Sequence, residues 1–188
     1  MSAVISKRAT LDDLAQVEGK AELIGGRIVH FMPTGLYPNL VAGRVYISLH
    51  GHSTEVSGGL ACTDNMGYTV PELPSGRESF SPDVSLYTAS LPKKWMRFIP
   101  GAPTFAAEVR SEGDYGRAPE ADLAEKRSDY FAAGTLVVWD VDTVNECIHV
   151  YRASNPTKAT TFRRGQIADA EPAVPGWKMA VDEVFGQA

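Results

Sequence analysis

Two apolar runs on either side of a helical pattern constrain the fold of this chain more than any other feature. The first run reads TFAAEVRS and the second TLVVWDVD, and both are rich in residues that favour β-strands. Between them lies PEADLAEKRSDYFAAG, in which Pro119 suits the first turn of a helix and Gly134 suits its C-terminal cap. We therefore predict a helix over 119–133. Because strand, helix and strand follow in order, we also predict a right-handed crossover between parallel strands.

The segments around this unit add further strands and a second helix. AELI and RIVHF flank a Gly-Gly pair, which is the signal of a β-hairpin with a two-residue turn. Apolar residues at helical spacing predict a helix from about 39 to 53, and ECIHVYR predicts a strand that follows TLVVWDVD across the turn DTVN. The expected fold class is α/β, with a mixed β-sheet flanked by helices and an N-terminal β-hairpin. No segment is long enough for a core of its own, so we expect a single domain over 1–188.

The charge balance limits the ways in which the protein can meet nucleic acid. The 188 residues carry a net charge of −5, which argues against a broad basic face that coats nucleic acid without specificity. It does not exclude an enzyme that acts on nucleic acid, because carboxylates that hold a divalent cation add negative charge that the ion offsets. The chain has no run of 18 apolar residues and no signal-peptide stretch, so we expect no membrane partner and a cytoplasmic location.

The cysteines and histidines give no pattern of metal ligation or nucleophilic catalysis. Cys62 and Cys147 are far apart and form no CxxC motif, so we expect buried thiols rather than a disulfide. Core thiols are favoured over catalytic nucleophiles, because no adjacent histidine pairing is visible in the sequence. The histidines lack the spacing of zinc ligands: they are His30, His50, His52 and His149.

Two carboxylates stand where the strand pattern calls for apolar residues. Asp83 precedes the run VSLYT, and Glu108 interrupts FAAEV. An unpaired buried carboxylate is costly, so each requires a partner. If their strands are neighbours, the two side chains converge at one end of the sheet, where their oxygens suit Mg²⁺ or Mn²⁺. Two alternatives stay open: Asp83 closes a turn after Ser81-Pro82, or Glu108 forms an ordinary ion pair with Arg110.

Lys126 and Glu22 are two further candidates. On the predicted helix, Lys126 falls about 60° from the line of Leu123 and Tyr130, at the edge of the buried stripe. The helix follows the strand of Glu108, so the ammonium group of Lys126 could reach over the end of the sheet and stabilise charge on a phosphate. The alternative for Lys126 is a solvated lysine on the helix surface. Glu22 lies in the first hairpin strand, where it either completes a carboxylate site or faces solvent.

An aspartate, followed by a strand with a glutamate and then by a lysine, resembles the signature of PD-(D/E)XK nucleases. The elements here are SPDVSLY, AAEVRS and DLAEKRSDYFAAGTLVVWDVD. With the early ELIGGRIV hairpin and the late PGW segment, this ordered set resembles the Uma2 family of restriction-endonuclease-like proteins. The resemblance covers roughly residues 10 to 186, which marks the expected core of the domain. It implies a restriction-endonuclease-like mixed β-sheet.

The resemblance also implies a reaction, namely metal-dependent hydrolysis of phosphodiester bonds in DNA with Mg²⁺ or Mn²⁺ as the cofactor. Asp83 and Glu108 match the metal ligands, and Glu22 matches the family's early acidic position. The lysine that usually follows the glutamate by two residues is replaced by Arg110. The resemblance therefore points to Lys126, on the next helix, as the catalytic lysine.

Arg110 and Ser111 are the expected contacts to the substrate phosphate. Arg110 is permanently charged, so it can anchor a phosphate but cannot accept a proton. Ser111 keeps one position of the loop that family members carry after this strand, whereas the following EGDYG departs from the family pattern. We therefore expect this loop to differ in shape.

Three functions stay open on the sequence alone. The first is a Mg²⁺-dependent endonuclease, which agrees with the presence of Asp83, Glu108 and Lys126. The second is a module that keeps the nuclease fold for binding or assembly without catalysis, which the acidic balance favours. The third is a hydrolase of another phosphoester, which would use the same types of residue. Restriction-type nucleases often pair so that two sites cut two strands, so the first function is compatible with a homodimer.

Overall fold

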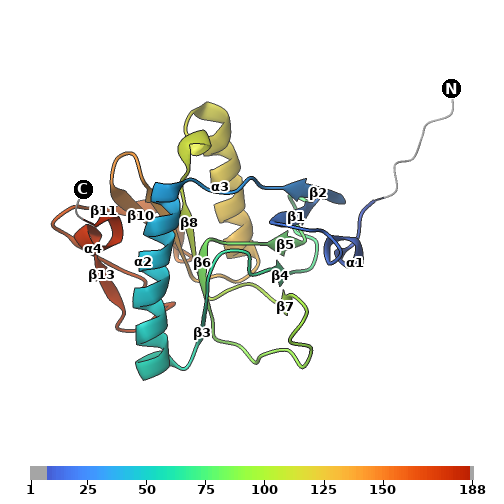
Figure 1. Ribbon diagram of the computed structural model, residues 1–188, viewed down its shortest axis with the longest axis horizontal. Helices are drawn as coiled ribbons and strands as arrows, with labels where there is room; N and C mark the ends of the chain where they lie inside the picture. The colour runs from blue at the N-terminus through green and yellow to red at the C-terminus, as the bar shows by residue number, and fades with distance from the viewer. Residues whose placement is uncertain (1–7, 187–188) are drawn as a thin grey trace.

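The computed structural model describes residues 8–186, and a six-stranded mixed sheet runs through its centre (Figure 1). The strand order is β11-β10-β9-β8-β6-β3. β8 and β9 are parallel, and the other neighbouring pairs in this sheet are antiparallel. The expected mixed sheet is therefore confirmed, with the parallel pair in its middle. Its strands are β3 (Leu60–Cys62), β6 (Val84–Tyr87), β8 (Phe105–Val109), β9 (Val137–Asp142), β10 (Cys147–Arg152) and β11 (Asn155–Arg163).

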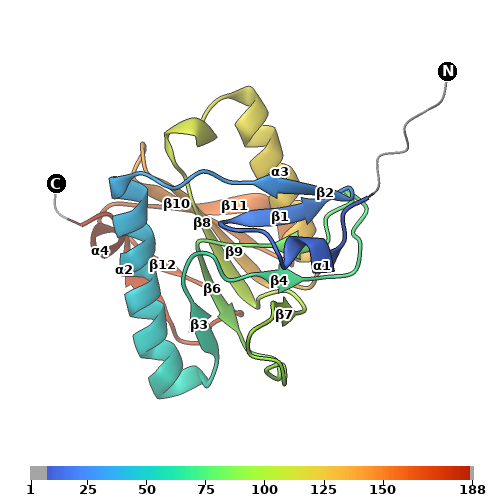
Figure 2. The ribbon, with the colours of Figure 1, turned by 45° about the vertical axis from the view of Figure 1, so that its right-hand side comes forward.

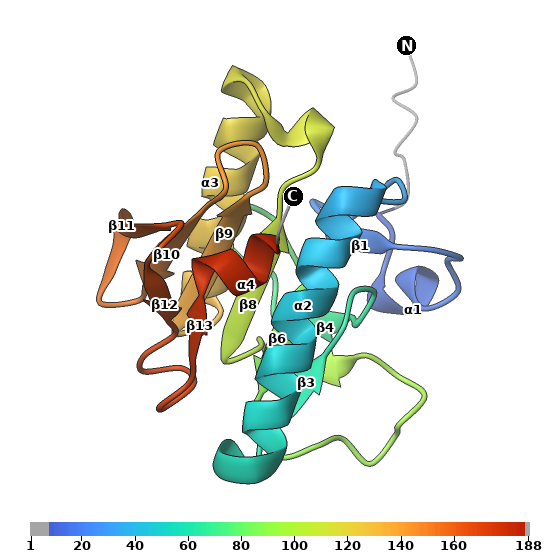
Figure 3. The same ribbon diagram turned by 60° about the vertical axis from the view of Figure 1, so that its left-hand side comes forward.

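Helices cover both faces of this sheet. α2 (Leu36–His52) and α4 (Val181–Phe185) pack on one face, in a core that includes Val45, and α3 (Arg117–Ala132) packs on the other face through Tyr130. Figure 3 shows α2 and α4 on the opposite side of the strands from α3. α3 joins the parallel strands β8 and β9, as the crossover pattern predicts. Both long helices begin two or three residues before the starts predicted from the sequence.

The N-terminal hairpin is confirmed and forms a small sheet of its own. β1 (Ala21–Ile24) pairs antiparallel with β2 (Arg27–His30). The two turn glycines, Gly25 and Gly26, have φ angles of 59° and 70°. Two successive positive φ values are the geometry of a type I′ turn, which explains why glycine occupies both positions.

Two more small sheets complete the fold. The sheet with the order β5-β4-β7 lies beside the hairpin (Figure 2), and Leu23 N donates to Ser79 Oγ across this contact at 2.7 Å. The other sheet pairs β12 with β13. Within residues 8–186, no helix is long and apolar enough to cross a membrane. The remaining elements are α1 (Leu11–Leu14), the π-helix η1 (Ser53–Ser57), β4 (Tyr68–Thr69), β5 (Ser79–Phe80), β7 (Ile99–Pro100), the 3-10 helix η2 (Glu112–Asp114), β12 (Ile167–Asp169) and β13 (Lys178–Ala180).

The second apolar run of the sequence becomes the interior strand β9. All of its residues are buried, because helices cover both faces of the sheet. On the α2 face, Trp139 is fully buried and stacks on Trp177 with ring centroids 4.8 Å apart. The residues that alternate with Trp139 include Asp140 and Asp142, which are also buried. Buried carboxylates require partners, so this strand places two negative charges in the interior that neighbouring side chains must pair with.

Candidate active site

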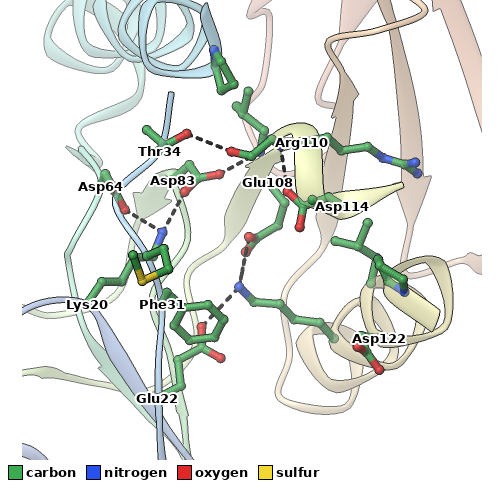
Figure 4. Close-up of a pocket in the computed structure, with 18 of the residues that line it drawn as sticks. Lys20, Glu22, Phe31, Thr34, Asp64, Asp83, Glu108, Arg110, Asp114 and Asp122 are labelled. Atoms are coloured by element: carbon green, nitrogen blue, oxygen red, sulfur yellow. Dashed lines mark hydrogen bonds and ion pairs between the residues drawn. The ribbon is translucent and has the colours of Figure 1, made fainter. Parts of the chain in front are cut away.

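A pocket of about 870 Å³ lies where the hairpin, the end of β8 and the first half of α3 meet (Figure 4). Its walls bring together segments that are far apart in the sequence. All of the candidate site residues line this pocket: they are Glu22, Asp83, Glu108, Arg110, Ser111 and Lys126. The residues selected from the sequence pattern therefore gather in one place.

Asp83 lies one residue before β6, next to the end of β8. Because β6 and β8 are antiparallel neighbours, Asp83 stands opposite Glu108. Its Oδ2 accepts a hydrogen bond from Val109 N at 2.7 Å, and its Oδ1 accepts one from Lys20 Nζ at 2.7 Å. Both carboxylate oxygens thus bind distant segments, which is not the arrangement of an aspartate that closes its own turn.

Glu108 projects toward α3 and is held there by two side chains. Lys126 Nζ donates to Glu108 Oε2 at 2.9 Å, and the hydroxyl of Tyr130 donates to Oε1 at 2.6 Å. Burial raises the pKa of Glu108, and the negative charge of Asp83 adds to the rise, against the opposing effect of Lys126. Figure 4 shows Arg110 pointing away from Glu108, so the alternative ion pair between these two is not the one that forms.

Glu22 is fully buried, so the solvent-facing alternative for this residue is wrong. Its Oε1 accepts a hydrogen bond from Ser81 N at 2.9 Å and lies 3.1 Å from Lys126 Nζ. Its Oε2 accepts a hydrogen bond from Arg77. Burial by itself would raise the pKa of Glu22, but the positive charges of Lys126 and Arg77 outweigh burial and hold this pKa below its usual value.

Lys126 lies between two glutamates, Glu22 and Glu108, which favour its positively charged form. Burial by itself would lower the pKa of Lys126, but Glu108 and Glu22 outweigh burial and raise it. The side chain is therefore an ammonium ion at neutral pH. It can donate hydrogen bonds and stabilise negative charge, but it is not available to accept a proton. The alternative of a solvated surface lysine is wrong, since the side chain is only 12% exposed.

Arg110 and Ser111 line the pocket, but both have protein partners. Arg110 Nε and Nη2 donate to the two oxygens of Asp140 at 2.6 and 2.8 Å, and the same guanidinium pairs with Glu120. Ser111 Oγ lies 2.8 Å from Thr34 Oγ1, within hydrogen-bond distance. A substrate phosphate would have to compete with two carboxylates for Arg110. The role of Arg110 and Ser111 in substrate binding stays a prediction.

The pocket also contains charged residues that sequence reasoning missed. Lys20 Nζ lies 2.7 Å from Asp83 Oδ1 and 2.6 Å from Asp64 Oδ1. Burial by itself would lower the pKa of Lys20, but the carboxylates around it raise the pKa instead. Lys20 precedes Glu22 by two residues at the start of a strand, and this spacing places both on one face, so it could have been found. Asp64 lies in a turn and Arg77 forms an isolated β-bridge with Ile24, and no local sequence pattern connects either residue to the pocket.

The central sheet is mixed, and two carboxylates and a lysine meet at the end of its antiparallel neighbours β6 and β8. These features define a restriction-endonuclease-like α/β protein. The family model of Uma2, described as "Putative restriction endonuclease", matches residues 9–182. The chain therefore belongs to the Uma2 family.

A solved structure shares this fold across almost its whole length. It is the crystal structure of a protein from Anabaena variabilis ATCC 29413 that is described as "a putative nuclease belonging to DUF820". The two chains are 18% identical, with a TM-score of 0.73, and the match covers 94% of this chain and 97% of the other. No curated protein matches the sequence. At this level of identity, the comparison establishes the architecture and leaves the chemistry to be argued from the pocket.

Proposed function

We propose that this protein is a metal-dependent endonuclease that hydrolyses phosphodiester bonds of DNA, with Mg²⁺ or Mn²⁺ as its cofactor. The observation that carries the proposal is the convergence of Glu22, Asp83, Glu108 and Lys126 in one pocket. Replacing apolar residues by a buried ionic cluster does not in general stabilise a fold, so such a cluster supports a functional role. Membership of a family described as "Putative restriction endonuclease" supports the same reaction class.

The donor set of the pocket fits a hard divalent cation. Asp83 Oδ1 and Asp64 Oδ1 already converge on one positive group, Lys20 Nζ, at 2.7 and 2.6 Å. Glu108 stands opposite Asp83 on the neighbouring strand, and the charge of Asp83 contributes to its raised pKa. Carboxylate oxygens are the ligands that Mg²⁺ and Mn²⁺ prefer. Asp83 and Glu108 are the residues that would hold the ion.

The residues around these two carboxylates supply positive charge and orientation. A bound divalent cation polarises a scissile phosphate and lowers the pKa of a water molecule. Lys126, as an ammonium ion, stabilises the negative charge that develops on the phosphate. Glu22 acts on Lys126 from the buried side, where the 3.1 Å contact and the fixed hairpin determine its direction. Tyr130 fixes the carboxylate of Glu108 through its hydroxyl.

The rim of the pocket favours a nucleic acid over a small phosphoester. Phe31 and Met32 line the pocket and are 38% and 87% exposed. The ring of Phe31 lies 5.6 Å from Lys126 Nζ, and Figure 4 shows it over the pocket. An exposed aromatic ring beside a cation can stack on a base while the cation meets a phosphate. This pairing supports a nucleic acid as the substrate class.

A second candidate is a binding or assembly module without catalysis. The observation that favours it is that Glu22, Asp83 and Glu108 each have a lysine or arginine partner already. A cluster that is balanced in this way has no electrostatic need for a metal ion. The two candidates differ in one measurable property, which is the affinity of the pocket for divalent cations.

The test is calorimetric titration with Mg²⁺ and with Mn²⁺, together with plasmid nicking on the same samples. Asp83→Asn removes the charge at nearly constant size, and Glu183→Gln on the exposed surface of α4 is the matched control. We expect Asp83→Asn to lower metal affinity and the nicking rate by more than about 100-fold. Loss of a group that only orients a metal ligand costs up to about 100-fold, and loss of a ligand itself should cost more. We expect Glu183→Gln to leave both unchanged.

Each outcome decides between the two candidates. Metal binding and nicking that persist at wild-type levels in Asp83→Asn would overturn the proposed site. A wild-type protein that neither binds metal nor nicks DNA would support the binding module. The homodimer and the cytoplasmic location predicted from the sequence stay predictions, and the homodimer is tested by sedimentation of the same samples.

A further inference from the structure

A second group of metal-ligating side chains lies outside the pocket, where β9 ends and β10 begins. Asp142 and Cys147 are directly opposite in the antiparallel pair of these strands, and His149 follows Cys147 by two residues. Opposite residues and residues two apart share a face of the sheet, so all three project to the same side. Asp142 and Cys147 are buried and His149 is partly exposed. None of the three lines the candidate active site.

Both cysteines are buried and free, as expected, but Cys147 is in direct contact with His149, a pairing that was not recognised from the sequence. Cys147 Sγ lies 3.6 Å from His149 Nε2. One ligand atom from each of Asp142, Cys147 and His149 lies within 4.8 Å of the other two. In tetrahedral zinc sites the Zn–S bond is about 2.3 Å and the Zn–N bond about 2.0–2.1 Å, which places sulfur and nitrogen about 3.6 Å apart. The observed spacing therefore suits one ion between them.

The surrounding hydrogen bonds orient these ligands. His149 Nδ1 lies 2.9 Å from Thr161 Oγ1, on the strand that follows, which leaves Nε2 directed at the sulfur. Asp142 Oδ1 accepts hydrogen bonds from the hydroxyl of Tyr115 at 2.9 Å and from Asn145 N at 2.9 Å. Fixing a histidine through its second nitrogen, and a carboxylate through outside donors, is how proteins hold metal ligands in place.

We propose that Asp142, Cys147 and His149 form a binding site for Zn²⁺, separate from the pocket of Asp83 and Glu108. Three protein ligands with a water in the fourth position are a common zinc arrangement. The donor set also selects the ion. A thiolate and an imidazole favour Zn²⁺ and Co²⁺, whereas the all-oxygen pocket favours Mg²⁺ and Mn²⁺. An ion here would tie the end of β9 to the start of β10.

The test is titration of the metal-free protein with Co²⁺, which reports thiolate ligation through a ligand-to-metal charge-transfer band. We expect one equivalent of Co²⁺ to bind with this band, and Zn²⁺ to displace it. Cys147→Ser should abolish the band. Cys62→Ser is the matched control, because Cys62 is the other buried free cysteine, and it should leave the band unchanged. Asp83→Asn should also keep it, since Asp83 belongs to the other pocket.

Two further variants protect the test against a folding defect in Cys147→Ser. His149→Gln removes a ligand that is partly exposed, and Thr161→Val removes the group that orients it. We expect Thr161→Val to weaken Co²⁺ binding about 10- to 100-fold, the usual cost of losing a group that positions a metal ligand. We expect a larger loss for His149→Gln. No thiolate band in the wild type, or a band of equal size in Cys147→Ser, would overturn the proposal. This experiment measures Co²⁺ binding and does not measure DNA nicking, so failure of the zinc proposal would leave the endonuclease proposal unchanged.

Discussion

Two clusters of buried charge meet at the end of β8, and they are held by different cations. The pocket cluster consists of Lys20, Glu22, Asp83, Glu108 and Lys126, and the arginine clamp consists of Arg110, Glu120, Arg127 and Asp140. Ammonium groups make most of the contacts in the first cluster, and guanidinium groups make those in the second. An ammonium is a point charge on a flexible stem, whereas a guanidinium is a rigid fork that matches a carboxylate.

The two clusters also differ in how accessible their carboxylates are. In the arginine clamp, Arg110 binds both oxygens of Asp140, and Arg127 Nη1 adds a third contact at 2.9 Å. Asp140 is 1% exposed, so its oxygens are closed to other ligands. In the pocket cluster, the side chains of Asp83 and Glu108 are 20% and 12% exposed and line the pocket. The clamp therefore joins the end of β8 to β9 and α3, whereas the pocket cluster keeps two carboxylates accessible at the proposed metal site.

The largest effect is expected from breaking the arginine clamp. Asp140→Asn removes the buried charge that the buried Arg110 and the partly buried Arg127 share, so it should lower the free energy of unfolding by about 3–5 kcal/mol, as for other broken buried pairs. Urea denaturation measures this loss. Glu120→Gln is the control, because Glu120 is 46% exposed and its pair should contribute less than about 1 kcal/mol. Equal stability of Asp140→Asn and wild type would show that the clamp is not a structural joint.

A smaller effect is expected when the pocket cluster loses one of its lysines. Lys20→Met removes an ammonium that lies 2.7 Å from the proposed metal ligand Asp83, so Mg²⁺ should bind about tenfold more tightly, or about 1.4 kcal/mol. Calorimetric titration measures this change. Lys178→Met, on the exposed side of β13, makes the same change in net charge without this contact. Weaker binding in Lys20→Met than in Lys178→Met would contradict the view that lysine and metal compete.

The smallest effect on stability is expected at Glu22, which pairs with both a lysine, Lys126, and an arginine, Arg77. Its pKa in the folded protein is lowered by Lys126 and Arg77. A lowered carboxyl pKa stabilises the fold above the unfolded value of about 4.3, and this contribution is lost as the pH falls through the folded pKa. The stability difference between wild type and Glu22→Gln should therefore narrow as the pH falls below about 4.3, by at most about 1.4 kcal/mol per unit of pKa shift. Urea denaturation at a series of acidic pH values measures this, and a gap that widens would contradict it.

Local patterns allowed most of the architecture to be predicted. The apolar runs of β8 and β9 and the capped helix between them are short-range signals, and the Gly-Gly pair identified the hairpin. The gathering of Asp83, Glu108 and Lys126 also follows from local order, because α3 continues the chain from the strand that carries Glu108. The convergence of these three needed no knowledge of distant contacts beyond the pairing of β6 with β8.

The missed contacts are of two kinds. Lys20 lies 63 residues from Asp83 and Arg77 lies 55 residues from Glu22, so no periodic pattern connects either pair. These contacts depend on how the hairpin docks, which is set by the packing of separate sheets. Cys147 and His149 are different, because they are two residues apart on a strand and alternation places them on one face. That pairing could have been predicted from this alternation.

The hairpin forms one wall of the pocket and is tied to the segment before β6 by hydrogen bonds from Leu23 N to Ser79 Oγ and from Ser81 N to Glu22 Oε1. Asp83 and Glu108 belong to one sheet, where strand pairing fixes the distance between them. Lys20 and Glu22 come from a different sheet, which reaches the pocket as a unit. A shift of the hairpin would thus change the electrostatic potential at the two carboxylates while their spacing stays constant. The spacing of the two carboxylates is therefore set by strand pairing within the main sheet, whereas part of the charge around them is set by how the hairpin docks against that sheet.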